Sequence, residues 1–161
     1  MKALGAAYAV EIWFRSDLPT DVRPVTGYLF SRGPDGHDTA DGDHLGLGGT
    51  HREGEAGKLL FYNGDRLKEV LVGKTVIRPG GWHHLAMARD GERVRVWLDG
   101  RLDIDGKAAA CAASRGPQVF LGGRNDGFAG FEGRIDEVAV YDRALDGAEV
   151  ARHVRSGTEA R

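Results

Sequence analysis

The sequence predicts an all-β fold of two antiparallel sheets, either a sandwich or a barrel, with one short C-terminal helix. Apolar and polar residues alternate in several short segments, and Asn-Gly or Asp-Gly pairs stand at the ends of some of them. The chain also holds 25 glycines among 161 residues, spread without a three-residue period. Glycine at this density is typical of many tight turns between strands rather than of long helices.

The first strand is expected at residues 8–15, where every second residue from Tyr8 to Phe14 is apolar and suited to one core face. Glycines bound or interrupt the next two apolar segments, and Asn63-Gly64, a strong tight-turn signal, ends the third. These segments predict strands at residues 27–31, 44–48 and 58–63.

The clearest signal covers residues 82–104, where apolar alternation flanks Asp90-Gly91 and a second pair, Asp99-Gly100, ends the next strand. This pattern predicts a three-stranded meander. Its aliphatic residues share one parity and are expected to face the core: Leu85, Met87, Val94, Val96 and Leu98.

Two more strands are expected at residues 119–121 and 134–141, after which the periodicity changes. Asp146 precedes Glu149 by three residues, as in a variant of the capping box, and Val150 and Val154 stand at i and i+4. The pattern predicts one helix, packed on an edge of the sandwich.

Composition excludes several classes of function. A formal net charge of −2 gives no general attraction to phosphate backbones or anionic lipid, so nucleic acid is not an expected partner. No apolar run approaches the roughly 20 residues of a membrane span, so membrane insertion is not expected. Cys111 is the single cysteine, which excludes an internal disulfide.

Three segments carry a family resemblance: YAVEIWFRSD at residues 8–17, GWHHLAMARDGERVRVWLDG at 81–100 and FEGRIDEVAVYDRAL at 131–145. The chain resembles the LamG-like domains of the concanavalin A-like lectin and glucanase superfamily over nearly its whole length. The resemblance implies a jelly-roll connection of two curved antiparallel sheets. It also implies a location outside the cytoplasm, extracellular or periplasmic, for the parent protein.

Such domains normally begin with a strand before the one expected at residues 8–15, and only seven residues precede it here. We therefore expect residues 1–161 to form a single LamG-like domain, excised from a longer multidomain protein and lacking the usual first strand.

Catalysis is not expected. Related glucanases place an acid and a nucleophile with a Glu-x-Asp-x-x-Glu strand motif, whereas no Glu of this chain has Asp two residues later. Ser31, Ser114 and Cys111 lack the G-x-S-x-G context of an exposed nucleophile. His83 and His84 are neighbours in a strand, point to opposite faces, and so cannot share a metal ion.

Sugar recognition requires an exposed aromatic face and polar groups that bind hydroxyls. Trp97, Arg95 and His84 share the non-aliphatic face of two adjacent strands and are the candidate ligand-binding residues, with Asn125 and Asp126 in a turn at the rim. The alternative is that Trp97 covers the sheet or lies beneath a loop.

The loop at residues 35–44 reads DGHDTADGDH and offers the oxygen ligands that Ca²⁺ prefers, with Asp41 and Asp43 as the candidates. Asp136 lies in IDEVAVY, which resembles the final-strand motif that holds a structural calcium in related jelly rolls. The alternatives are a solvated acidic loop, and an Asp136 that caps a loop or pairs with an arginine.

The leading hypothesis is a non-catalytic binding module for carbohydrate, with calcium as the candidate cofactor. The alternative is a structural or protein-interaction domain that packs on neighbouring domains of its parent and has no sugar site.

Overall fold

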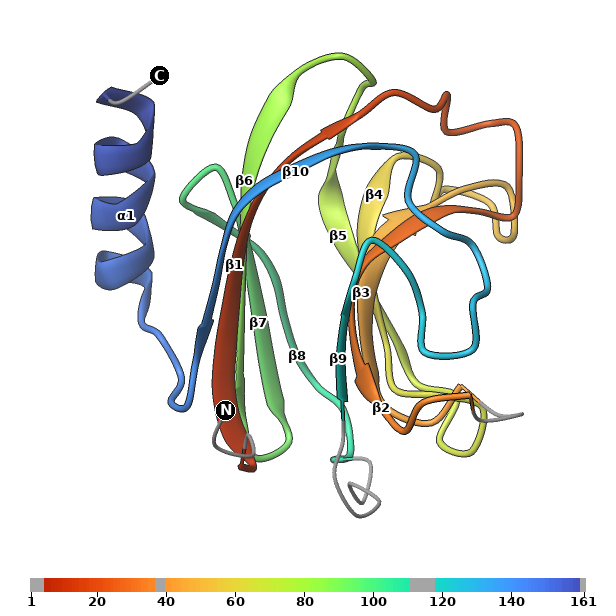
Figure 1. Cartoon of the computed structure of the whole chain (residues 1–161), viewed down its shortest axis with the longest axis horizontal. Coiled ribbons are helices and arrows are strands. Elements are labelled where there is room, and N and C mark those ends of the chain that lie inside the picture. Colours follow the sequence, from red (N-terminus) through yellow and green to blue (C-terminus); the bar gives the residue numbers. More distant parts are fainter. Residues whose placement is uncertain (1–4, 37–39, 111–117, 160–161) are drawn as a thin grey trace.

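The computed structural model of the chain describes residues 5–36, 40–110 and 118–159. Within these residues two five-stranded sheets face each other, and one helix lies on the far side of the first sheet (Figure 1). Sheet A has the order β10-β1-β6-β7-β8, and sheet B the order β5-β4-β3-β2-β9. Every pairing between neighbouring strands is antiparallel.

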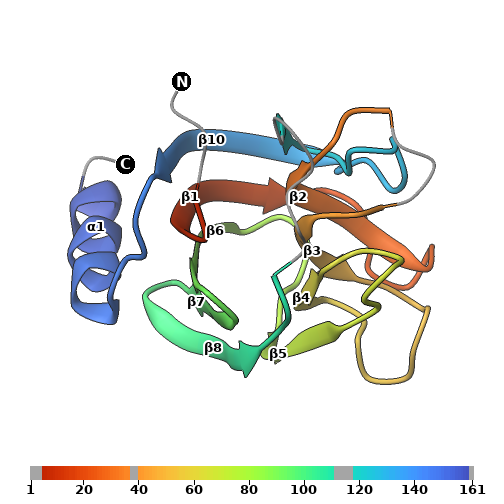
Figure 2. The same cartoon turned by 90° about the horizontal axis from the view of Figure 1, so that it is seen from below.

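The elements are β1 (Ala7–Ser16), β2 (Val25–Gly33), β3 (Asp43–Gly48), β4 (Lys58–Tyr62), β5 (Val70–Val76), β6 (Trp82–Asp90), β7 (Arg93–Leu98), β8 (Arg101–Lys107), β9 (Gln118–Leu121), β10 (Gly133–Tyr141) and α1 (Gly147–Glu159). The view in Figure 2 shows the two sheets as separate layers of one sandwich. The all-β jelly-roll prediction is confirmed. We had not expected β5, because its sequence VLVGKTV interrupts the apolar alternation with a glycine.

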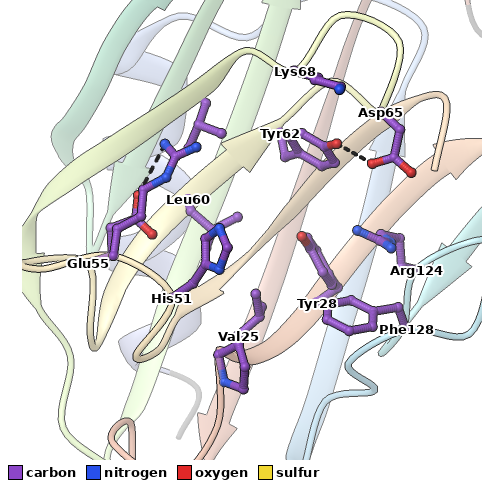
Figure 3. A pocket seen from close by; sticks show the side chains of 13 residues that line it. Val25, Tyr28, His51, Glu55, Leu60, Tyr62, Asp65, Lys68, Arg124 and Phe128 are labelled. Atoms are coloured by element: carbon purple, nitrogen blue, oxygen red, sulfur yellow. Dashed lines mark hydrogen bonds and ion pairs between the residues drawn. The ribbon is translucent and has the colours of Figure 1, made fainter. Parts of the chain in front are cut away.

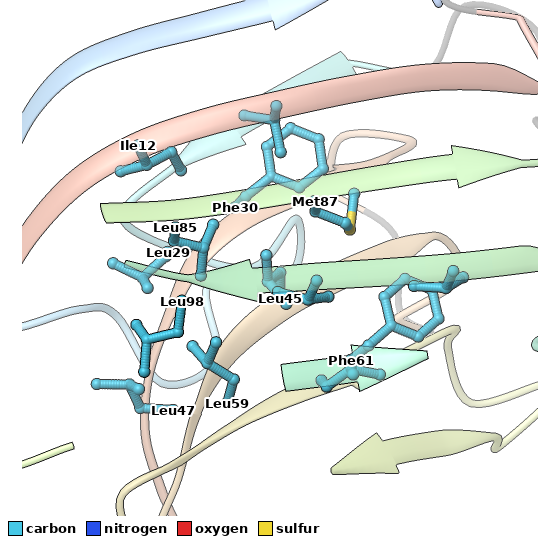
Figure 4. Packing of buried hydrophobic residues seen from close by; sticks show 14 of the residues in the cluster. Ile12, Leu29, Phe30, Leu45, Leu47, Leu59, Phe61, Leu85, Met87 and Leu98 are labelled. Carbon is cyan, nitrogen blue, oxygen red and sulfur yellow. The ribbon is translucent and has the colours of Figure 1, made fainter. Parts of the chain in front are cut away.

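The β6–β7 hairpin forms as expected, with Asp90 opposite Arg93 and a positive φ of 58° at Gly91 in the turn. The aliphatic parity of both strands is buried between the sheets, as predicted. Figure 4 shows Leu85, Met87 and Leu98 of sheet A packed among side chains of sheet B that include Leu45 and Phe61.

One buried ion pair joins the two sheets. Arg89 of β6 is 1% exposed, and its Nε lies 2.8 Å from the Asp43 carboxylate at the start of β3. The Tyr8 hydroxyl donates a 2.6 Å hydrogen bond to the same carboxylate, and burial raises the pKa of this phenol, which keeps the proton on the donor. The Asp43 carboxylate of sheet B thus accepts hydrogen bonds from two residues of sheet A, Tyr8 and Arg89, and this fixes how β3 meets β1 and β6.

The helix α1 begins with a reciprocal cap. The Glu149 N–H donates to Asp146 Oδ1 at 2.8 Å, and the Asp146 N–H donates to Glu149 Oε2 at 3.0 Å. The buried side chain of Val150 then packs on the outer face of sheet A. The helix therefore covers a sheet face, not the sandwich edge we had expected. In the part of the chain described, no helix is both long and apolar enough to cross a membrane.

Candidate functional site

A groove lies on the face of sheet B opposite the core, and its cavity volume is about 330 Å³. Its floor comes from β2, β4 and β5, and three loops form its walls: β3–β4, β4–β5 and β9–β10 (Figure 3). The lining residues are Pro24, Val25, Tyr28, His51, Arg52, Glu55, Leu60, Tyr62, Asp65, Lys68, Val70, Arg124 and Phe128. We call this the sheet B groove.

A row of three rings crosses the strands beneath the groove. The His44 ring lies between Tyr28 and Tyr62, with 5.9 Å between its centroid and that of each tyrosine. Alternation places His44 and Tyr62 on the face away from the core, and a register shift in β2 between Tyr28 and Phe30 brings Tyr28 to the same face. Beside it Gly46 lets β3 and β2 approach closely, because a Cβ there would lie only 2.5 Å from the Gly27 carbonyl oxygen. The floor is therefore a closely packed aromatic row.

Hydrogen bonds hold His44 in one tautomer. Its Nε2 lies 2.8 Å from the Ala40 carbonyl oxygen, which can only accept, so Nε2 carries the proton. Its Nδ1 then accepts from the Ser31 hydroxyl at 3.0 Å. Burial lowers the pKa of His44 to about 4, so the ring is neutral at physiological pH. His44 acts as a fixed support for the two tyrosines.

Arg124, in the β9–β10 loop, forms one wall of the groove. Its guanidinium lies over the Phe128 ring at 4.6 Å from the centroid and over Tyr28 at 5.4 Å. Asp126 holds it with two hydrogen bonds, of 2.8 and 2.6 Å. The Phe128 side chain remains 46% exposed, so the loop offers solvent an apolar ring beside a fixed hydrogen-bond donor.

The β4–β5 and β3–β4 loops carry acceptors and cations. The Tyr62 hydroxyl donates to Asp65 Oδ1, and this bond lowers the pKa of the Asp65 carboxyl and keeps it ionised. Arg52 and Glu55 form an ion pair with 3.7 Å between Nη1 and Oε1. Figure 3 shows Lys68 near Asp65, on the side of Arg124, and Glu55 on the other side of the groove. Donors and acceptors thus surround an aromatic floor, an arrangement suited to a polyhydroxylated ligand.

The family of the chain follows from a family model that matches residues 2–151 and is described as the concanavalin A-like lectin/glucanases superfamily. The chain belongs to this superfamily. The predicted resemblance is therefore confirmed over most of the sequence. A search of curated proteins gave no significant match.

Solved structures support the same fold for this superfamily member at low sequence identity. One similar structure is domain 4 of AbnA, an extracellular GH43 arabinanase from Geobacillus stearothermophilus, in complex with arabinotriose. It has a TM-score of 0.69 at 20% identity, and the alignment covers 94% of this chain and 68% of that chain. The CBM40 of a Ruminococcus gnavus IT-sialidase, bound to α2,3-sialyllactose, has a TM-score of 0.72 at 19% identity. The alignment covers 94% of this chain and 84% of the CBM40 chain. A heptameric SAP-like pentraxin from Limulus polyphemus has a TM-score of 0.66 at 18% identity, covering 91% and 68%.

The sequence prediction of an exposed Trp97 was wrong. Trp97 shares its face with His84 and Arg95 as expected, but α1 covers that face and leaves Trp97 only 4% exposed. Leu145 and Val150 belong to the same buried cluster. Parity placed these residues opposite the core, but could not show that an amphipathic helix buries that face as well.

The other two candidate residues on this face, His84 and Arg95, also pack against aromatic rings. His84 is 2% exposed and meets the Trp13 ring edge-on at 5.2 Å between centroids. Arg95 is half-buried, with its guanidinium 5.4 Å from the Trp97 ring centroid. A sugar therefore has no open aromatic face at Trp97 to stack on.

The predicted rim turn lies beside the sheet B groove. Asp126 binds Arg124 there, while Asn125 is buried and its Nδ2 donates to the Pro34 carbonyl at 2.9 Å. Sequence reasoning missed Tyr28, Tyr62 and Phe128. A signal was available for Tyr62, whose parity is opposite to that of the core residues Leu59 and Phe61. None was available for Tyr28, which has the parity of the buried Phe30 and is separated from it by a register shift.

The three candidate calcium ligands do not come together. Asp43 is committed to Arg89, Asp41 Oδ2 lies 3.3 Å from Arg66 Nη2, and Asp136 lies in β10 on the other sheet. Asp136 Oδ1 accepts from the Glu137 N–H at 2.9 Å. Among the described residues, no group of three or more His, Cys, Asp or Glu side chains has the geometry to hold a metal ion.

Proposed function

We propose that this domain is a non-catalytic module that binds carbohydrate in the sheet B groove. The observation that carries the proposal is the combination of the exposed ring of Phe128 and the half-buried ring of Tyr62 with the fixed polar groups of Arg124 and Asp65. Aromatic faces pack on the C–H groups of sugar rings, while ionised side chains hydrogen-bond the hydroxyls. The sugar-bound arabinanase domain and CBM40 share this fold, which supports the choice of ligand class.

The electrostatics of the groove favour binding over hydrolysis. A glycosidase needs one carboxyl that stays protonated near neutral pH. In the groove, the hydrogen bond from Tyr62 moves the pKa of Asp65 in the opposite direction, and Glu55 is paired with Arg52. We further propose that the domain serves a larger exported protein, as domain 4 serves the extracellular arabinanase.

The test is a glycan array followed by calorimetric titration of the best ligand. Phe128→Ala should weaken binding about tenfold, equivalent to about 1.4 kcal/mol, because it removes the exposed stacking face. Leu102→Ala is the matched control, since Leu102 is equally exposed but lies in β8 of the other sheet. It should bind like the wild type.

A wild-type domain that binds no glycan would defeat the proposal and favour the alternative module that packs on neighbouring domains. Equal losses in Phe128→Ala and Leu102→Ala would show that the sugar binds elsewhere. Release of reducing sugar by the pure domain would overturn its non-catalytic part.

A further inference from the structure

A second cleft lies between α1 and the outer face of sheet A, and its volume is about 430 Å³. Figure 1 shows the helix standing beside β10 and β1, the strands that border it. The described lining residues are Glu11, Trp13, His84, Glu137, Ala139, Tyr141, His153, Ser156 and Gly157. We call this the helix cleft. It is separated from the sheet B groove by the whole thickness of the sandwich.

The charges around the helix cleft are one-sided. Two carboxylates, Glu11 and Glu137, line it, whereas no Lys or Arg is among the described lining residues. Burial lowers the pKa of His84, so this ring adds no positive charge at neutral pH. The Nδ1 atom of His153, from α1, lies 2.8 Å from the Glu11 carboxylate. The cleft therefore has the electrostatics of a cation site.

Glu11 is buried with an acceptor to spare. It is 4% exposed, and its Oε2 accepts from the Tyr141 hydroxyl at 2.7 Å and lies 2.8 Å from His153 Nδ1. Its Oε1 has no hydrogen-bond partner, because the nearest donor, His84 Nε2, is 3.6 Å away. An unsatisfied buried carboxylate oxygen is costly, so a bound donor would be stabilised here.

The backbone brings the second carboxylate to the rim. The β1–β10 register shifts between Glu11 and Trp13, and this bulge holds Glu137 at a φ of +48°. Such a conformation costs a non-glycine residue free energy and recurs at ligand sites. On the helix side Gly157 allows close approach, since a Cβ there would lie 2.9 Å from the Trp13 ring. The side chains of Trp13, Glu11 and Glu137 thus line one cleft.

We propose that the helix cleft binds a primary ammonium group, held between Glu11 and Glu137 and against the Trp13 ring. An ammonium supplies three donors, matches the negative charge, and is attracted to the face of an indole. A divalent metal fits less well, because the side chains do not converge as metal ligands. The proposal does not depend on sugar binding in the sheet B groove.

The test follows the indole N–H signal of Trp13 by NMR while n-butylammonium chloride is added at constant ionic strength. A saturable shift is expected, and n-butanol, which has the same chain without the charge, should give none. Glu137→Gln should weaken binding at least fivefold, and Glu11→Gln should abolish it. Glu92→Gln, at an exposed carboxylate in the β6–β7 turn, is the control and should bind like the wild type.

Glu137 is exposed, so Glu137→Gln remains informative if Glu11→Gln fails to fold. Equal shifts with butanol, undiminished binding in Glu137→Gln, or no saturation would each overturn the proposal. Glucosamine and Nα-acetyllysine then distinguish the two sources of an ammonium, an amino sugar and a protein side chain. Binding of either supports the site, and a site that binds neither is only an adventitious cation site, which refutes it.

Discussion

Trp97→Ala tests whether α1 covers the outer face of sheet A. Trp97 is 4% exposed and packs in a cluster with Leu145 and Val150. Truncating a buried tryptophan leaves a cavity and costs about 3 to 5 kcal/mol. In a domain of this size each kcal/mol lowers the Tm by about 2 to 4 °C, so the expected fall is about 6 to 20 °C.

The assay is thermal and urea unfolding followed by circular dichroism. Leu102→Ala, at an exposed apolar residue of the same sheet, should change the free energy of unfolding by less than about 0.5 kcal/mol. If Trp97→Ala behaved like this control, Trp97 would be exposed and α1 would not pack on it. Binding in the sheet B groove should survive the conservative change Trp97→Phe, because the two sites lie on opposite outer faces.

Three further predictions concern charge. Burial lowers the pKa of His44 from 6.5 to about 4, so between these pH values the unfolded chain binds a proton that the folded chain does not. The free energy of unfolding should therefore fall by about 3 kcal/mol as the pH drops from 6.5 to 4. Urea titrations of His44→Asn should show a flatter pH dependence. Arg89→Met should cost about 3 to 5 kcal/mol, since it strands the buried Asp43 carboxylate, and Asp43→Asn in the same chain should recover part of that loss. Calcium binding at Asp41 or Asp136 stays a prediction: a higher Tm in millimolar Ca²⁺ than in EDTA, lost in Asp136→Asn, would support it, and identical melts would refute it.

The sequence could predict every strand except β5, because each of the others carries its own local pattern. Alternation in residues 8–15 and 93–98 chose the core faces correctly, and Asp90-Gly91 fixed a hairpin turn. The capping pair Asp146 and Glu149 indicated where the helix begins, because the two residues are only three positions apart. These features depend on contacts between residues close in sequence.

The candidate site could not be predicted in the same way. Tyr28 and Tyr62 become neighbours only because β3 pairs with both β2 and β4, and Phe128 arrives on a loop between two different sheets. The same limit explains the error at Trp97. Alternation separates the two faces of a strand, but whether the second face meets water depends on where a distant helix packs.

The placement of α1 also determines which face of the sandwich is available to a large ligand. The helix covers the part of the outer face of sheet A that holds Trp97 and Trp13, and the helix cleft lies between it and the sheet. The outer face of sheet B carries no such cover among the described residues, and there the ring of Phe128 stays exposed. In our proposals a glycan chain therefore binds in the sheet B groove, and the helix cleft takes a single ammonium group. This division predicts that a saturating glycan leaves the Trp13 indole signal unshifted in NMR spectra, and a shift there would show that the two faces are coupled.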